Sequence, residues 1–339
     1  MSESLFECLR GQCESQGFDL CHPFHTGWYN TLIEDEGHVK SGVLKKLSVP
    51  PPSRFFGDNT TNTSVCNAVL LGNTKKIWPY FLEFLKEKYE EEKQRLSDSE
   101  EALKLVLDEP FDKFCTMKLQ KIFEEIHKKS SGENGEEFEY DFFWSHGKCN
   151  KMKSAGKTNG TSHLITLESD ENLMVSMQRA AVVTGHYWHD VDGTKLCIHP
   201  KFGTWSSFRA VVLIRNKCEV SFDHELIPKA APSLLSRPIP DSEIAKAQEV
   251  MKVALGLTMN GDTLSTKYGE SLCQFLHSTV VEGSDWSKIS PSMRSWIHLR
   301  DCISLGRSEY RFENPQLLYH YTRDSRILRN ELKLIEPEN

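Results

Sequence analysis

The sequence predicts an α+β fold with an antiparallel or mixed sheet. Three observations lead to this prediction: short apolar runs typical of strands, longer runs with apolar residues every three or four positions, and no regular alternation of the two. With 339 residues, the chain is long enough for one large domain or two smaller ones. We divide it into a core over residues 1–220 and a largely helical region over 221–339 that completes or caps this core.

The first part of the chain alternates between strand and helix patterns. "GFDLCHPFHTGWYNTLI", residues 17–33, begins with alternating polarity and predicts a strand that passes into a helix. After a stretch rich in Pro, Asn and Thr, "VCNAVLLGN" predicts a second strand that ends near Gly72. From residue 75 to about 95, helical spacing predicts one buried stripe, formed by Ile77, Trp78, Phe81, Phe84, Leu85 and Tyr89.

The middle of the chain combines helix patterns with a polar segment. Residues 108–129 predict an amphipathic helix with Pro110 near its start and basic residues at its end. Residues 130–162 are rich in Ser, Gly, Asn, Glu and Lys, which predicts an insertion or solvated loop. The aromatic island "FEYDFFW" within it is the exception, because its side chains would be costly to leave in water. Further helices are expected within residues 172–188 and from 241 to about 257.

Residues 197–214, "CIHPKFGTWSSFRAVVLI", predict a strand, a turn and a second strand. Pro200 and Gly203 are expected to shape the turn, while Trp205 packs beneath it or faces a flat ligand. In the second strand, alternation places Arg209 on one face with Val211 and Leu213. An arginine among apolar neighbours is costly unless it meets an anion, so we expect either a structural carboxylate or an anionic ligand.

Several functional classes lose support from the sequence. There is no GxxxxGK[ST], GxGxxG, GxSxG or HExxH motif. "CHPFH" at 21–25, "HYWH" at 186–189 and the nearby Cys197 and His199 offer ligand-like histidines, but a structural zinc site usually has paired clusters with closely spaced cysteines. We therefore expect no metal bound directly by side chains. The net charge of -7 argues against nucleic acid and anionic membrane surfaces as partners.

The cysteine pattern and the N-terminal sequence predict a cytoplasmic protein. The ten cysteines include no CxxC pair and no regular spacing, so we expect reduced thiols. The N-terminal segment has no apolar run long enough for a signal peptide, and no later run approaches the length of a transmembrane helix.

Four stretches resemble a known family in the same order along residues 15–216. "CIHPKFGTWSSFRAVVLI" resembles the "CIHPRFGGWFAIRGVVLL" stretch of the cobalamin-processing CblC family, which is associated with methylmalonic aciduria and homocystinuria type C. Residues 17–33 resemble its segment with PF and WYN, "DEPFDKFCTMKL" its DPVDQCVAYHL, and "MQRAAVVTG" its AQTAAHVAG.

The resemblance implies a flavin-reductase-like, nitroreductase-related fold that binds cobalamin with its lower base detached. Members of this family remove the upper axial ligand: cyanide leaves reductively with electrons from FAD or FMN and NADPH, and an alkyl group leaves to glutathione thiolate. A downstream cobalamin-trafficking protein and a flavin reductase are the implied partners. Residue by residue, the resemblance assigns Arg209 to a glutathione carboxylate and assigns to cobalamin the residues Val175, Ser176, Met177, Gln178, His189, Cys197 and Phe208.

The chain departs from the family at positions that keep alternatives open. Val182 stands where the family has His, Lys195 stands where it has Gly, and Lys288 lies near the place of an Arg in its DWTYRD motif. Arg326 and Arg329 are the candidates for a further family arginine. Besides a processing enzyme, the sequence therefore allows a cobalamin chaperone or adaptor without dealkylation chemistry, and a flavin reductase of the same fold that acts on another substrate.

Overall fold

The computed structural model describes most of the chain as two compact units, each built from three stretches. The described residues are 5–35, 67–96, 98–133, 138–145, 157–158, 161–162, 175–216, 232–260 and 290–333. Unit 1 consists of Met1–Asn73, Phe111–His186 and Ser207–Leu235, and unit 2 of Thr74–Pro110, Tyr187–Ser206 and Ser236–Asn339. The functional division near residue 220 stays a prediction.

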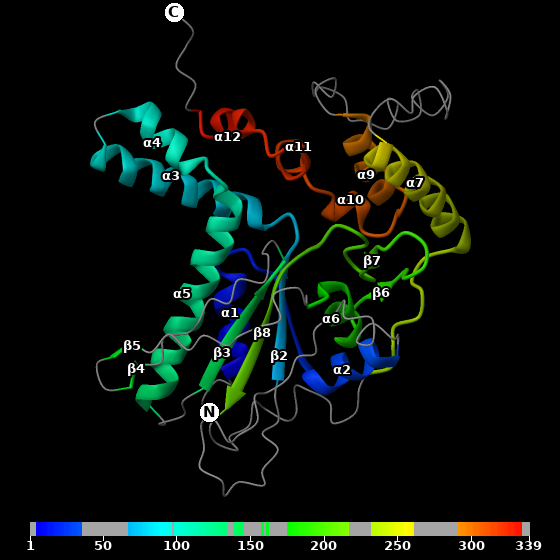
Figure 1. The fold of residues 1–339 in the computed structure, drawn as a ribbon, viewed down its shortest axis with the longest axis horizontal. Coiled ribbons are helices and arrows are strands. Elements are labelled where there is room, and N and C mark those ends of the chain that lie inside the picture. The colour runs from blue at the N-terminus through cyan, green and yellow to red at the C-terminus, as the bar shows by residue number, and fades with distance from the viewer. Residues whose placement is uncertain are drawn as a thin grey trace, which may run out of the picture. The chain divides into compact units, whose positions relative to one another are not determined.

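Unit 1 contains a four-stranded antiparallel sheet with the strand order β1-β2-β8-β3 (Figure 1). Its strands are β1 (Leu20–His25), β2 (Asn67–Asn73), β8 (Ser207–Asn216) and β3 (Phe138–Trp144). Every residue of β2 is buried, which fits the uninterrupted apolar run that predicted this strand. The predicted α+β class with an antiparallel sheet is confirmed.

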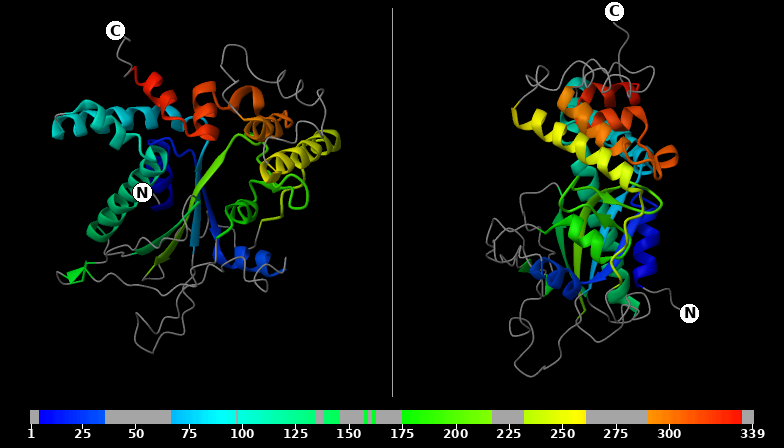
Figure 2. Two further views of the ribbon diagram at one scale, coloured as in Figure 1. Left: turned by 45° about the horizontal axis from the view of Figure 1, so that its top comes forward. Right: turned by 90° about the vertical axis from the view of Figure 1, so that its right-hand side faces the viewer.

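Helices cover both faces of this sheet. The helices α1 (Leu5–Glu14) and α5 (Pro110–Glu133) lie along one face, and α2 (Thr26–Asp35) and α6 (Met177–Val183) along the other (Figure 2). Phe123 of α5 packs against Tyr140 and Phe142 of β3, with ring centroids 5.2 and 5.1 Å apart. Phe114 of α5 stacks on Phe18 at 5.8 Å. Aromatic packing therefore anchors α5 to the sheet.

The aromatic island of the predicted insertion is the edge strand β3. Phe138, Tyr140 and Phe142 are buried and alternate along one face, where they meet α5. The sequence analysis excepted this island from the solvated loop expected over 130–162, and its burial agrees with that exception, because alternate aromatic residues give the segment an apolar face to bury. The loop expectation is wrong for residues 130–133, which continue α5. The two-residue strands β4 (Lys157–Thr158) and β5 (Thr161–Ser162) pair with each other, and the rest of the segment lies outside the described residues.

Unit 2 is mainly helical. Its strands are the two-residue pair β6 (Trp188–His189) and β7 (Cys197–Ile198), and its described helices are α3 (Ile77–Arg95), α4 (Ser99–Val106), α7 (Asp241–Asn260), α9 (Pro291–Asp301), α10 (Arg307–Tyr310), α11 (Asn314–Thr322) and α12 (Ser325–Glu331). The helices predicted at 75–95 and 241–257 are confirmed, and all six residues of the predicted α3 stripe are buried. Ile244, Val250 and Met251 of α7 share a core cluster with Leu299 of α9. Among the described residues, no helix is both long and apolar enough to cross a membrane.

Candidate functional site

Residues 197–206, the first half of the stretch that resembles the CblC family, form a tight turn in unit 2. The backbone N–H groups of His199 and Gly203 each donate to the carbonyl of the other, at 2.9 and 2.8 Å. The His199 Nδ1 atom accepts hydrogen bonds from the backbone N–H groups of Lys201 and Phe202, at 3.0 and 3.3 Å. Gly203 has φ +57°, a left-handed conformation that glycine adopts without steric cost. His199 therefore holds the turn together, in addition to the predicted Gly203.

Trp205 packs beneath this turn, which settles one of the two predicted roles. Its side chain is fully buried, and the Arg300 guanidinium lies 4.4 Å above its ring. The same guanidinium lies 4.9 Å from the Phe312 ring. Arg300 donates to the Thr204 carbonyl from Nε at 3.0 Å and from Nη2 at 2.5 Å. Thr204 Oγ1 in turn donates to the Arg300 carbonyl at 3.1 Å. These contacts join α9 to the turn, so Trp205 is part of the core rather than a platform for a ligand.

Arg300 is a buried cation that the sequence analysis missed. It is 8% exposed, and its described polar partner is a neutral carbonyl, with two aromatic rings over its plane. The signal was present in "SWIHLRD", because Ile297 and Arg300 lie three residues apart and share one helix face. Lys288, to which the sequence comparison pointed, lies outside the described residues.

The structure brings His189 and Cys197 together. They are direct partners in the β6–β7 pair, so their side chains lie on the same face. His189 is buried and Cys197 is half-buried. The two residues that the resemblance assigned to cobalamin in unit 2 therefore form one local group.

Lys195 lies in the loop between β6 and β7 with φ +59°, in the left-handed region. Its N–H donates to the Asp190 carbonyl at 2.9 Å, and the Asp190 N–H donates to the Leu196 carbonyl at 3.1 Å. The Asp190 carboxylate also accepts from the Thr194 N–H at 2.6 Å. This closed loop requires a positive φ at the position where the family has Gly. The lysine keeps the backbone conformation that a glycine would adopt most easily.

In unit 1, Arg209 is the extra residue of a β-bulge in β8. The β2–β8 register pairs Leu71 with Ala210 and then Gly72 with Phe208, which leaves Arg209 opposite no β2 residue. A bulge breaks the strict alternation of side chains and redirects the extra one. The assignment of Arg209 to the face of Val211 and Leu213 assumed an unbroken strand, and the register change does not support that assumption.

Arg209 is 8% exposed and has identifiable contacts in unit 1. Its Nε donates to Asn73 Oδ1 at 2.6 Å, and its guanidinium lies 4.6 Å from the Phe111 ring at the start of α5. Asn73 is fully buried. These two contacts hold the guanidinium in place. Phe208, the preceding residue, is half-buried.

The segment Val175–Gln178 forms the start of α6. Ser176 is the N-cap, because its side chain accepts from the Arg179 N–H at 3.3 Å. The Ser176 N–H donates to the hydroxyl of Tyr29, a fully buried residue of α2, at 2.9 Å. Val175 and Met177 are buried, whereas Gln178 is exposed. This short segment is thus fixed by a cap and by one long-range hydrogen bond, and α6 contacts β8 within the same unit.

The predicted site residues therefore form two sets. The segment Val175–Gln178, Phe208 and Arg209 belong to unit 1, whereas His189 and Cys197 belong to unit 2. Val182, the other departure from the family, is half-buried in α6.

The two histidine-containing stretches, 21–25 and 186–189, contact each other through one pair of rings. In unit 1, the rings of His22 and His186 lie 4.3 Å apart, and His25 Nδ1 accepts from the Gly27 N–H at 3.0 Å. Burial lowers the pKa of His25, which favours its neutral form. Within the described ranges, no three or more His, Cys, Asp or Glu side chains are grouped as metal ligands would be.

Comparison with solved structures finds a similar fold. The crystal structure of a C. elegans B12-trafficking protein CblC, described as a homologue of human MMACHC, superposes with a TM-score of 0.53. The superposition covers 98% of this chain and 97% of that one, at 14% sequence identity. No protein-family model and no curated protein sequence matches the chain. The chain thus has the fold of a CblC protein over nearly its full length.

Proposed function

We propose that this chain is a cobalamin-processing protein of the CblC family, which binds cobalamin base-off and removes its upper axial ligand. The observation that carries the proposal is the fold likeness to a B12-trafficking CblC protein over 98% of the chain. The order of the four resembling sequence stretches supports it independently, since this order does not depend on the superposition. The flavin-reductase-like, nitroreductase-related character of the fold and a cytoplasmic location belong to the same proposal.

Cobalamin is the substrate in this proposal, and its cobalt supplies the reactivity. In dealkylation, a glutathione thiolate forms a bond to the alkyl carbon, the cobalt–carbon bond breaks, and its electron pair stays on cobalt as cob(I)alamin. In decyanation, cobalt is reduced by flavin with NADPH as the electron source, and cyanide leaves. The protein would supply binding, orientation and exclusion of water.

The residues suited to these tasks are those that the structure holds rigidly. Val175 and Met177 offer apolar contact at the capped start of α6, and half-buried Phe208 offers an aromatic face in the neighbouring strand. The contacts with Asn73 and Phe111 fix the Arg209 guanidinium, and a fixed guanidinium is suited to bind a glutathione carboxylate through two parallel hydrogen bonds. His189 and Cys197 are the candidates in unit 2 for contact with the corrin.

A chaperone or adaptor role is the second candidate, because the described contacts of Arg209 also suit a structural residue. Asn73 and Phe111 hold its guanidinium in a buried position between β2 and α5. If this is the whole role of Arg209, the protein would bind cobalamin and pass it to a trafficking partner without thiol-dependent dealkylation.

Visible absorption spectra of purified protein with cyanocobalamin and with methylcobalamin test the proposal. We expect the protein to shift both spectra toward the base-off form, and glutathione or reduced flavin then to produce a further change as the upper ligand leaves. Matched samples without protein give the uncatalysed rates.

The outcomes separate the three functional classes. A base-off shift without turnover supports the adaptor. Flavin binding with unchanged cobalamin spectra supports a flavin reductase that acts on another substrate. Spectra unchanged by the protein under every condition would overturn the cobalamin proposal.

A further inference from the structure

A buried cluster in unit 2 contains two guanidinium groups and one carboxylate around an indole ring. The guanidiniums of Arg300 and Arg311 lie 4.4 and 5.4 Å from the centre of the Trp205 ring. Arg300 is 8% exposed, and Trp205 and Phe312 are buried. The side chains of Arg311 and Asp301 are 18% and 11% exposed. All these charges are therefore largely removed from water.

The charges of this cluster do not balance. Arg311 donates from Nε and Nη2 to the two carboxylate oxygens of Asp301, at 2.8 and 3.0 Å, so these two charges neutralise each other. Within the described ranges, Arg300 forms no ion pair, and it donates to the carbonyl of Thr204. The carbonyl dipoles at the end of α9 favour Arg300 there, but they carry only partial charges. One positive charge thus remains in excess, where an unbalanced charge is costly.

Three nitrogen donors of the cluster have no acceptor in the part of the chain that the structure describes. The indole Nε1 of Trp205 is buried and has no hydrogen-bond partner. Arg300 and Arg311 each donate from Nε and Nη2, which leaves the Nη1 atom of both without an acceptor. Because a buried donor without an acceptor destabilises the fold, an additional acceptor at this place would be stabilising.

The arrangement of these donors suits a monatomic anion better than a carboxylate. Arginine typically binds a carboxylate through two parallel hydrogen bonds, and in both arginines Nε and Nη2 already donate to other acceptors. A monatomic anion accepts single hydrogen bonds from several directions. The three donors come from different parts of the chain: Trp205 follows β7, Arg300 is in α9, and Arg311 follows α10.

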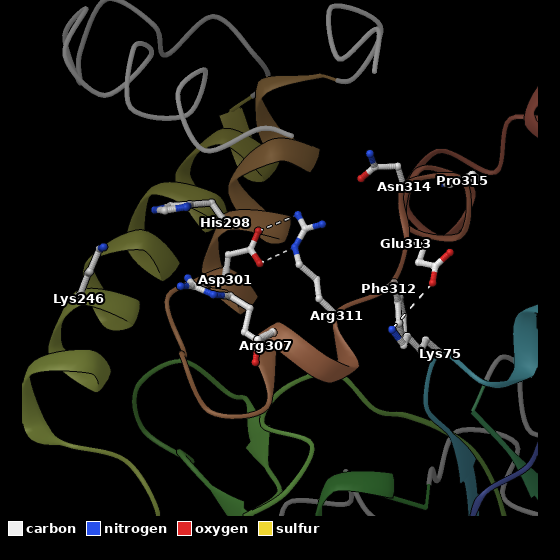
Figure 3. Close-up of a pocket in the computed structure, with 11 residues that line it drawn as sticks. Lys75, Lys246, His298, Asp301, Arg307, Arg311, Phe312, Glu313, Asn314 and Pro315 are labelled. Carbon is white, nitrogen blue, oxygen red and sulfur yellow. Dashed lines mark hydrogen bonds and ion pairs between the residues drawn. The ribbon is translucent and has the colours of Figure 1, made fainter. Parts of the chain in front are cut away.

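The cluster borders a pocket of about 800 Å³, which gives an ion a route from solvent. Asp301, Arg311 and Phe312 are among the residues that line this pocket. Figure 3 shows Arg311 and Asp301 facing each other there, joined by their two hydrogen bonds. Arg311 thus takes part both in the pocket wall and in the contacts around Trp205.

We propose that this cluster binds a monovalent inorganic anion such as chloride, which accepts hydrogen bonds from Trp205 Nε1 and from Nη1 of Arg300 and Arg311. Its single negative charge equals the excess positive charge of the cluster. The anion joins α9 and the segment after α10 to the turn of residues 197–206, so it stabilises unit 2. This site lies outside the cobalamin proposal, and its test does not require cobalamin.

Thermal unfolding of the full chain tests the site, with sodium gluconate replaced stepwise by sodium chloride at constant ionic strength. Constant ionic strength keeps the screening of surface charges equal, so only specific binding changes the melting temperature. We expect a saturable rise of about 2 to 4 °C once chloride is at roughly ten times its Kd. Sodium bromide should act in the same way, and sodium formate, which supplies a small carboxylate, should not.

Trp205→Phe removes the indole N–H and keeps an aromatic ring, so it should abolish most of the chloride-dependent rise. Trp78→Phe is the matched control, because Trp78 is also buried in unit 2 and packs against Phe81 and Tyr319. Both variants lose packing and should melt at a lower temperature, but Trp78→Phe should keep the full rise. Equal rises in the two variants would overturn the assignment of the Trp205 N–H.

Crystals of the unsubstituted protein in sodium bromide locate the ion by anomalous scattering, and this measurement needs no variant to fold. We expect a peak within hydrogen-bond distance of Trp205 Nε1. Bromide at surface positions alone would identify an adventitious ion only and would overturn the site, as would a melting temperature that does not respond to chloride. Stabilisation by formate without stabilisation by chloride would overturn the monatomic assignment in favour of a carboxylate ligand. None of these outcomes depends on whether the protein processes cobalamin.

Discussion

Residues 197–206 and residues 207–216 are consecutive in the chain and resemble the same family, yet they have different roles. The first half is a turn whose unusual residues are explained by packing: His199 and Gly203 close it, and Trp205 is buried against Arg300. The second half is a central strand in which Arg209 occupies a bulge. Packing accounts for His199, Gly203 and Trp205 in the first half, whereas the buried guanidinium of Arg209 in the second half is suited either to packing or to an anionic ligand.

The largest effect is expected at the turn. In Gly203→Ala, the added Cβ would lie 1.8 Å from the carbonyl oxygen of Leu305, at a position with φ +57°. Backbone atoms would have to move, so we expect the free energy of unfolding to fall by about 3 kcal/mol or more. Thermal or denaturant unfolding measures this change.

Gly11→Ala is the control for the same substitution, because a Cβ at Gly11 in α1 meets no atom within 4 Å. Replacing an exposed helical glycine should leave stability unchanged or raise it. If Gly203→Ala were as stable as Gly11→Ala, the turn would not be the rigid structural element described above.

Arg209→Gln comes next and addresses the strand. If Arg209 binds a glutathione carboxylate, the glutathione concentration needed for dealkylation should rise about ten-fold, while cobalamin binding and flavin-driven decyanation change less. The readouts are the glutathione dependence of dealkylation and the melting temperature of the same protein. Arg95→Gln removes a charge from an exposed position that pairs with Glu92, and it should change neither.

A purely structural role of Arg209 gives a different pattern. The loss of its contacts with Asn73 and Phe111 would then lower the melting temperature, and all activities would decline together. A destabilised Arg209→Gln protein with unaltered glutathione dependence would contradict the thiol-site assignment and favour the adaptor.

The sequence predicted some elements of the fold better than others. Helical spacing predicted α3 and α7, because a buried stripe repeats with a period that the sequence displays directly. The aromatic island within 130–162 was recognised as an exception to the polar loop, but its polar surroundings gave no indication that it forms the strand β3. Composition describes the average of a segment, whereas burial depends on the pattern within it.

The candidate site was harder to predict than the fold. The bulge at Arg209 depends on the register against β2, and no local pattern in β8 marks it. Arg300 was missed because its burial depends on the rings of Trp205 and Phe312, which lie outside its own helix α9. A resemblance can assign residues to a site, but their partners come from segments distant in the sequence.

The smallest effect on stability is expected at Lys195, which lies just before the turn of residues 197–206. Lys195 departs from the family's glycine but has φ +59°. In the folded protein, a left-handed conformation destabilises a residue with a Cβ by about 1 kcal/mol or more. Glycine avoids this steric cost, but its unfolded chain has more conformational entropy, which lowers the free energy of unfolding by about 0.5 to 1 kcal/mol. Lys195→Gly should therefore raise the free energy of unfolding slightly, by about 0.5 kcal/mol.

Lys195→Ala separates the backbone from the side chain. It removes the hydrogen bond from Lys195 Nζ to the Val191 carbonyl but keeps the Cβ, so it should not stabilise the protein. Denaturant unfolding of both variants gives the comparison. Because Lys195 already holds the glycine-like backbone, cobalamin spectra of Lys195→Gly should match those of the unsubstituted protein. If Lys195→Gly gained a dealkylation activity that Lys195→Ala and the unsubstituted protein lack, the replacement of the family's glycine by Lys195 would separate an adaptor from an enzyme on this fold. Arg209 would then not be the deciding residue.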